Sequence, residues 1–143
     1  MAKERVLLVD DEPDFTEILS ERMRARDMVV DTANSGIEAI NLVKKKYYDA
    51  IILDLQMPGL DGIETLNQIL SDSPDQQVIF LTGHASVPKS VEAMKLGAAE
   101  FLEKPANIDQ LVELIQTAQF KKAVLFEKKM EQSIDKLKKT KGW

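Results

Sequence analysis

The chain has 143 residues, of which 44% are hydrophobic and 30% charged, and it contains no cysteine. This length predicts one globular domain with a self-supporting core. The absence of cysteine excludes disulfides, thiolate metal sites and a cysteine nucleophile. Apolar stretches such as residues 50–53 are far shorter than the roughly 20 residues of a membrane-spanning helix. The apolar start of the chain stops at Asp10, so we expect no signal peptide, no membrane association and a cytoplasmic location.

Charge is distributed unevenly along the chain. Residues 120–143 contain eight lysines and three acidic residues, a charge of +5, so residues 1–119 carry −10. An acidic body repels nucleic acid, so we expect no direct nucleic-acid binding by this segment, and it favours cations or basic partners. The mixed charges of residues 120–143 are more typical of a solvated helix face than of a binding surface.

Short runs rich in valine and isoleucine alternate five times with segments of helical periodicity. The predicted strands are residues 5–9, 28–33, 49–53, 77–81 and 99–102. Four of these are near-continuous hydrophobic runs, typical of strands covered on both faces, whereas 28–33 is mixed and suits a sheet edge. The alternation predicts an α/β fold: a doubly wound, five-stranded parallel sheet with five helices and right-handed crossovers.

The last predicted helix begins at Asn107, a favourable N-cap, and meets neither proline nor glycine before Gly142. We predict one helix over residues 107 to about 139, with a core domain at 1–119 and a helical tail, or a linker to an output domain, at 120–143. About 24 residues are too few for a helix-turn-helix domain. Imperfect heptads suggest a homodimer through this helix, with the alternative of a face formed by the fourth and fifth helices. The expected contact stripe is Phe120, Val124, Met130, Ile134 and Leu137.

Polar side chains follow four of the five predicted strands. Asp10 and Asp11 follow the first strand, and Asp54, Thr82 and Lys104 follow the third, fourth and fifth. In open parallel sheets, ligands bind beyond the carboxyl ends of the strands, so these groups should converge there. Three carboxylates that repel one another call for a cation, and an all-oxygen set favours Mg²⁺ or Mn²⁺ over zinc.

The same residues favour phosphoryl chemistry. Lys104 and the Thr82 hydroxyl supply what a phosphoryl group needs, and magnesium recruits phosphate oxygens. His84, the only histidine, is better explained as an exposed loop residue than as a base. Asp54 is therefore the best candidate nucleophile, because carboxylates form aspartyl phosphates. Each residue alone is more often structural, but together they favour phosphoryl transfer.

Four motifs occur in order: VLLVDDE (6–12), LDLQMPGLDG (53–62), LTGH (81–84) and FLEKP (101–105). Over residues 3–119 the chain resembles the receiver domain of two-component response regulators. The resemblance implies a flavodoxin-like fold with a five-stranded parallel sheet and five helices. It also implies a phosphoryl group taken onto an aspartate from the phosphohistidine of a sensor histidine kinase or phosphotransfer protein.

The resemblance assigns roles to the residues that match its motifs. Asp54 would be the phosphoacceptor, Asp11 would bind Mg²⁺ directly, Asp10 would bind it largely through water, and the backbone carbonyl of Gln56 would complete the metal ligands together with Asp54. Lys104 and Thr82 would contact the phosphoryl oxygens, Thr82 and Phe101 would form the conformational switch, and Gln56 and His84 would tune dephosphorylation. The isomer of the Lys104–Pro105 bond is left open.

Two other functions are weighed against this one. A magnesium-dependent phosphatase with an aspartyl-phosphate intermediate fits less well, because the haloacid dehalogenase type carries a second aspartate where this chain has Gln56. A receiver-like interaction module that is never phosphorylated has no need to retain the repelling acids. We therefore expect a phosphoacceptor signalling domain rather than an enzyme.

Overall fold

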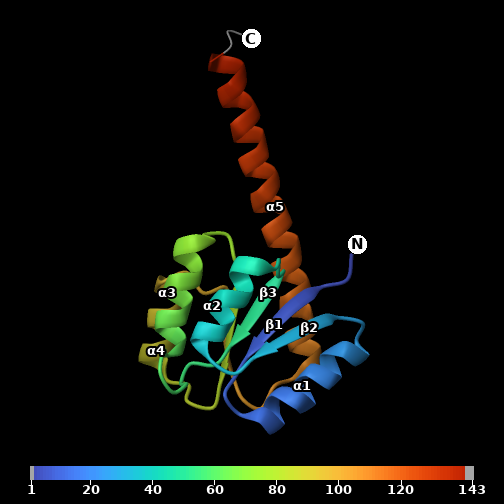
Figure 1. Ribbon diagram of the computed structural model, residues 1–143, viewed down its shortest axis with the longest axis vertical. Coiled ribbons are helices and arrows are strands. Elements are labelled where there is room, and N and C mark those ends of the chain that lie inside the picture. The colour runs from blue at the N-terminus through green and yellow to red at the C-terminus, as the bar shows by residue number, and fades with distance from the viewer. Residues whose placement is uncertain (1, 141–143) are drawn as a thin grey trace.

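In a computed structural model, which describes residues 2–140, five parallel strands form one sheet between two layers of helices (Figure 1). The strands are β1 (Arg5–Val9), β2 (Val29–Ala33), β3 (Ala50–Leu53), β4 (Val78–Thr82) and β5 (Glu100–Glu103). The helices are α1 (Pro13–Ala25), α2 (Gly36–Lys45), α3 (Gly62–Asp72), α4 (Val87–Lys95) and α5 (Ile108–Thr140). The predicted fold class, with its helical extension, is confirmed.

The sheet has the strand order β2-β1-β3-β4-β5. All neighbouring strands pair in parallel, with Leu7 opposite Ile51 and Phe80 opposite Phe101. The predicted edge position of the second strand is correct. The fifth strand was expected to be covered on both faces, and this is wrong: β5 is the other edge, and its residues are partly exposed because only β4 lies beside it.

Alternate residues of each central strand point to opposite helical layers, as the twofold period of a strand requires. Leu7 and Val9 belong to the core cluster under α2, α3 and α4, whereas Val6 and Leu8 belong to the cluster under α1 and α5. Phe80, at 0% exposure, is the largest fully buried side chain of the first cluster. Burial on both faces explains why these strands consist of continuous apolar runs.

Helix α5 is a single helix of 33 residues that continues well past the sheet (Figure 1). Leu111 and Ile115 on its first half are fully buried against the sheet. The predicted helix over residues 107–139 is thus confirmed, while residues 141–143 lie outside the described residues. We call residues 120–140 the arm. The division of domains at residue 119 stays a prediction.

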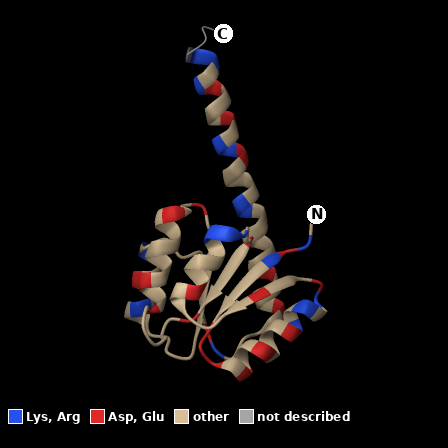
Figure 2. Ribbon diagram, in the orientation of Figure 1, with Lys and Arg blue, Asp and Glu red and all other residues tan. Residues whose placement is uncertain are grey.

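Lysines recur along the arm (Figure 2). The interpretation of this segment as a solvated helix face is wrong for Lys122, because its ammonium group packs against the loops before β3 and β4. Phe120, Met130 and Leu137 are at least half exposed. No helix within residues 2–140 is long and apolar enough to cross a membrane.

Candidate functional site

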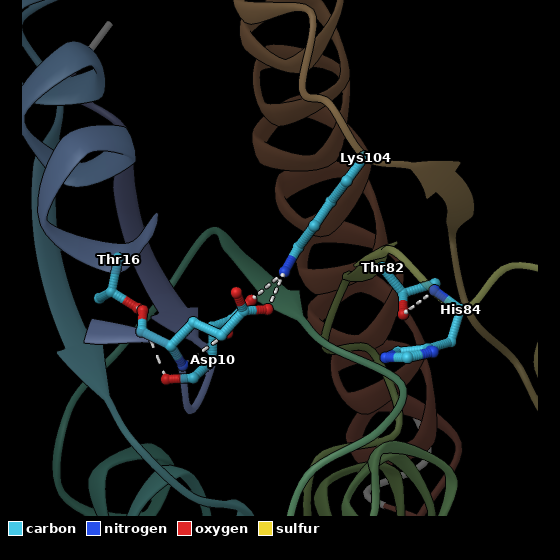
Figure 3. A network of polar contacts seen from close by, with 6 residues as sticks. Asp10, Thr16, Thr82, His84 and Lys104 are labelled. Carbon is cyan, nitrogen blue, oxygen red and sulfur yellow. Dashed lines mark hydrogen bonds and ion pairs between the residues drawn. The ribbon is translucent and has the colours of Figure 1, made fainter. Parts of the chain in front are cut away.

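The site lies at the carboxyl ends of β1, β3, β4 and β5 (Figure 3). Asp10 directly follows β1, Asp54 directly follows β3, Thr82 is the last residue of β4, and Lys104 directly follows β5. Thr82 was predicted to follow its strand, and the structure extends β4 by one residue to include it. The strand order places these residues beside the point where the chain reverses direction across the sheet, between β1 and β3.

Lys104 pairs with two carboxylates of the segment that follows β1. Its Nζ lies 2.8 Å from Asp10 Oδ2 and 3.2 Å from Glu12 Oε1, and 4.0 Å from the centre of the Phe15 ring. Burial alone would lower the pKa of Lys104, but its hydrogen bonds with Asp10 and Glu12 and the negative charges of Asp10 and Asp54 hold that pKa above the usual value. Lys104 is therefore a fixed cation at neutral pH.

Asp54 is a buried carboxylate, only 3% exposed. Its Oδ1 atom is buried without a hydrogen-bond partner. Burial raises the pKa of Asp54, and the charge of Asp10 adds to this, while the Thr82 hydroxyl and Lys104 act in the opposite direction. Buried polar atoms are nearly always satisfied, so an unsatisfied carboxylate oxygen beside a lysine indicates a position prepared for a ligand or for bond formation.

An open cavity of about 460 Å³ lies in front of Asp54. Its lining residues are Asp11, Glu12, Asp54, Gln56, Met57, Pro58, Asp61 and His84. Thr82 is fully buried beside it, and its Oγ1 accepts a hydrogen bond of 3.1 Å from the backbone N–H of His84. His84 itself is exposed, as predicted. The cavity brings together the predicted residues Asp11, Asp54, Gln56 and His84.

Three carboxylates come close enough to share a cation. One oxygen each of Asp10, Glu12 and Asp54 lies within 4.8 Å of the others. Sequence reasoning did not assign a role to Glu12, although it completes the DDE motif. Its backbone N–H donates to Asp10 Oδ1 at 2.9 Å, and its Oε1 lies 3.2 Å from Lys104 Nζ. Asp11, the predicted direct ligand, lines the cavity instead.

Gly62, the first residue of α3, fixes the loop that follows Asp54. A side-chain carbon at position 62 would clash with the backbone of Asp54 and Leu55. The Gly62 N–H donates to the Leu55 carbonyl at 2.8 Å. Asp61 forms a capping box with Glu64 that starts α3 at this position. Only glycine allows α3 to begin this close to the acidic site.

Phe101 lies one strand away from the carboxylates. Its half-buried ring packs against Phe80 with a centroid distance of 5.8 Å. It also lines a separate cavity with Ser86, Val87 and Glu103, so one side of the ring borders open space at the start of α4. The Lys104–Pro105 bond, left open by the sequence, is cis.

The strand order and the acidic cavity define a flavodoxin-like α/β domain with a polar site at the carboxyl edge of its sheet. A family model described as "response regulator receiver domain" matches residues 6–116. The chain belongs to this family and is a receiver domain of two-component response regulators.

Similar sequences support this assignment. The chain is 38% identical over 106 residues to the transcriptional regulatory protein ZraR of Klebsiella oxytoca, covering 74% of this chain and 24% of that protein. It is 35% identical over 117 residues to the C4-dicarboxylate transport transcriptional regulatory protein DctD of Pseudomonas aeruginosa, covering 82% of this chain and 25% of that protein. The chain thus spans about a quarter of the length of these relatives.

Solved structures show the same fold. A response regulator receiver domain protein from Clostridium thermocellum has a TM-score of 0.81 and 31% identity, covering 85% of this chain and 98% of that one. The response regulator TrrA from Thermotoga maritima, solved in complex with Mg²⁺-BeF, has a TM-score of 0.73 and 33% identity, covering 80% of this chain and 98% of that one.

Proposed function

We propose that Asp54 accepts a phosphoryl group from the phosphohistidine of a sensor histidine kinase or phosphotransfer protein. The observation that supports this most directly is the buried, unpartnered Oδ1 of Asp54 beside an open cavity. A carboxylate oxygen forms a bond to phosphorus while the bond between phosphorus and the histidine nitrogen breaks. Intact-mass measurement after incubation with acetyl phosphate and Mg²⁺ tests the assignment, because the Asp54→Asn variant should remain unmodified.

The neighbours of Asp54 have distinct tasks in this proposal. Lys104, held by Asp10 and Glu12, balances the negative charge of the incoming phosphoryl oxygens. The Thr82 hydroxyl, next to Asp54, donates a hydrogen bond to one of those oxygens. Gln56 and His84 border the cavity, where they control the approach of water and hence the lifetime of the phosphoryl group.

The residues of the site fit a magnesium ion. The candidate ligands are oxygens only, and Asp54 contributes a buried oxygen that lacks a partner. We propose that Asp10, Asp11, Asp54 and the Gln56 carbonyl would hold the ion, with Glu12 as an additional carboxylate. Bound Mg²⁺ would neutralise charge on the carboxylates and on the phosphoryl oxygens.

Magnesium binding is expected to depend chiefly on Asp11, because Asp10 and Glu12 are already paired with Lys104. In a calorimetric titration, Asp11→Ala should weaken binding at least tenfold, since few carboxylates hold this ion. Asp14→Ala, which removes an exposed carboxylate on the first turn of α1, is the matched control and should bind normally. If Asp11→Ala binds Mg²⁺ as tightly as the wild type, the metal site does not include Asp11.

Phosphorylation would act as a switch because the Thr82 hydroxyl can donate to a phosphoryl oxygen only when the phosphoryl group is present. We propose that Thr82 and Phe101 form this two-state element and that it alters the surface of α4, β5 and α5. The domain would thus be an acceptor that controls an output in the cytoplasm, rather than an enzyme with turnover.

We propose a homodimer as one consequence, with the arm as the contact. Phe120, Met130, Ile134 and Leu137 are 47–63% exposed, which is a large apolar stripe for a solvated helix. Isolated helices of this length are marginal in water, so a second arm packed along the stripe would stabilise both. The face of α4 and α5, with Val87 76% exposed, is the alternative contact.

Sedimentation of the full chain is expected to distinguish these contacts. Ile134→Glu should weaken association at least tenfold, because it places a charge in the middle of the apolar stripe. Gln132→Glu adds the same charge at an exposed position off the stripe and should associate like the wild type. Removing residues 120–143 should have the effect of Ile134→Glu. If neither change alters association with or without acetyl phosphate, the arm is only a linker.

A further inference from the structure

A group of polar contacts fastens the beginning of the arm to the body. These contacts lie at the amino ends of the strands, opposite the acidic cavity. The residues of α5 that take part are Gln119, Lys122 and Lys129. Their partners lie in the loop between α2 and β3 and in the loop between α3 and β4, apart from one contact of Gln119 with the backbone of Ala2. None of these residues takes part in the proposed phosphotransfer.

Lys122 is the centre of this group. Its Nζ donates to the Tyr48 carbonyl at 2.7 Å and to Gln76 Oε1 at 2.8 Å, and it lies 3.9 Å from the centre of the Tyr47 ring. Burial lowers the pKa of Lys122 to about 8, although Asp49 and Asp75 act in the opposite direction. A partly desolvated ammonium is costly to leave unpaired, so these contacts hold it firmly.

The partners of Lys122 are themselves fixed. Gln76 is 4% exposed, and its Nε2 donates to the same Tyr48 carbonyl at 3.1 Å. The Tyr48 side chain is buried, and its hydroxyl donates to Asp31 Oδ2 at 2.6 Å. The lysine is therefore seated in a rigid network that spans β2, β3 and β4.

Two further contacts lie on the same face of α5, before and after Lys122. The buried Gln119 donates from Nε2 to the Ala2 carbonyl at 3.1 Å and to Asp49 Oδ2 at 3.4 Å. Lys129, two helical turns after Lys122, pairs with Asp75 Oδ2 at 2.6 Å. Three attachments spread over eleven residues of one helix resist bending as well as rotation.

We infer that Gln119, Lys122 and Lys129 form a latch that holds the arm in one direction and at one rotation, so that body and arm move as a single rigid lever. Without the latch, the helix beyond the buried Ala118 would lose its hydrogen bonds and its ion pair to the loops before β3 and β4. With the latch, a displacement of α5 at the sheet is carried along the arm, because no hinge absorbs it.

The latch also decides which face of the arm is free. Lys122 and Lys129 point toward the body, and at roughly 100° per residue Met130 lies about 80–100° and Ile134 about 120–140° around the helix from them. Most of the apolar stripe therefore lies to one side of the latch, and Met130, Ile134 and Leu137 are 47–56% exposed. A second arm can reach the stripe without displacing the latch.

The latch can be tested by the distance between two spin labels on one chain, in protein that has not been phosphorylated and at concentrations below those at which it associates. The chain has no native cysteine, so labels on Gln68→Cys in α3 and Ser133→Cys in the arm are unique. Both positions are exposed. Diluting the labelled protein with unlabelled protein removes distances between copies. The distance distribution is expected to be narrow in the otherwise unchanged chain and at least twofold wider in Lys122→Met.

Lys121→Met is the matched control, because it removes the same charge from an exposed neighbouring position and should keep the narrow distribution. Lys129→Met removes only the surface ion pair with Asp75 and leaves the core untouched, so it tests the latch even if Lys122→Met fails to fold. It should give an intermediate width. Distributions as narrow as that of the unchanged chain in both Lys122→Met and Lys129→Met would overturn the inference.

Discussion

Replacing Asp54 with asparagine is expected to abolish phosphorylation while leaving the protein folded. Asparagine keeps the shape of the side chain but has no carboxylate oxygen to bond phosphorus. After incubation with acetyl phosphate and Mg²⁺, intact-mass measurement should show one added phosphoryl group on the wild type and none on Asp54→Asn. Asp61→Asn is the matched control: Asp61 lines the same cavity, and asparagine still caps α3, so this variant should be modified normally.

The same substitution is expected to stabilise the fold at pH 7. Burial raises the pKa of Asp54, which means that the folded state disfavours the charged form. The unfolded chain carries the charge at no such cost, so the folded wild type is destabilised above the raised pKa. The gain in the variant should therefore shrink as the pH falls toward 4. Urea unfolding at both pH values measures it; lower stability of Asp54→Asn at pH 7 would contradict this account.

Replacing Lys104 with methionine is expected to reduce both stability and phosphorylation. The Asp10 side chain is 1% exposed and pairs with Lys104 at 2.8 Å, and breaking such a buried pair costs roughly 3 kcal/mol. The phosphorylation rate should fall at least tenfold, because the incoming phosphoryl oxygens lose their positively charged neighbour. Urea unfolding without divalent ions and the rate of labelling by acetyl phosphate measure the two effects.

Lys104→Arg separates charge from geometry. Arginine retains the positive charge, so this variant should recover most of the stability lost in Lys104→Met. Mg²⁺ should also restore stability to Lys104→Met in part, since it can neutralise the same carboxylates. If Lys104→Met is as stable as the wild type without divalent ions, Asp10 is not held by this pair.

The sequence was sufficient to predict most of the strands and the convergence of Asp10, Asp54 and Lys104, because these depend on local patterns and on a general property of parallel sheets. The exposure of β5 could not be predicted in this way. An apolar run such as Phe101-Leu102 has the same local sequence pattern in a central strand and in an edge strand. Its exposure depends on the order of strands in the sheet.

The contacts of Glu12 and Lys122 could not be predicted from the sequence for a related reason. Glu12 reaches Lys104 across 92 positions of sequence, and Lys122 reaches the Tyr48 carbonyl across 74. No periodicity connects such distant positions. A lysine on a mixed-charge helix looks solvated until the loops that the helix crosses are known, so only the folded chain distinguishes Lys122 from Lys121.

The length of strand β4 separates the acidic site from the latch. Thr82 ends the strand beside Asp54, while Gln76, two residues before the strand begins, receives the arm. Five residues of strand extend roughly 17 Å, beyond the reach of direct contact. Substitutions in the loops at residues 46–49 and 73–77 can therefore redirect the arm without disturbing the acids. Such a division would let one phosphoacceptor design evolve toward different outputs while its chemistry stays the same.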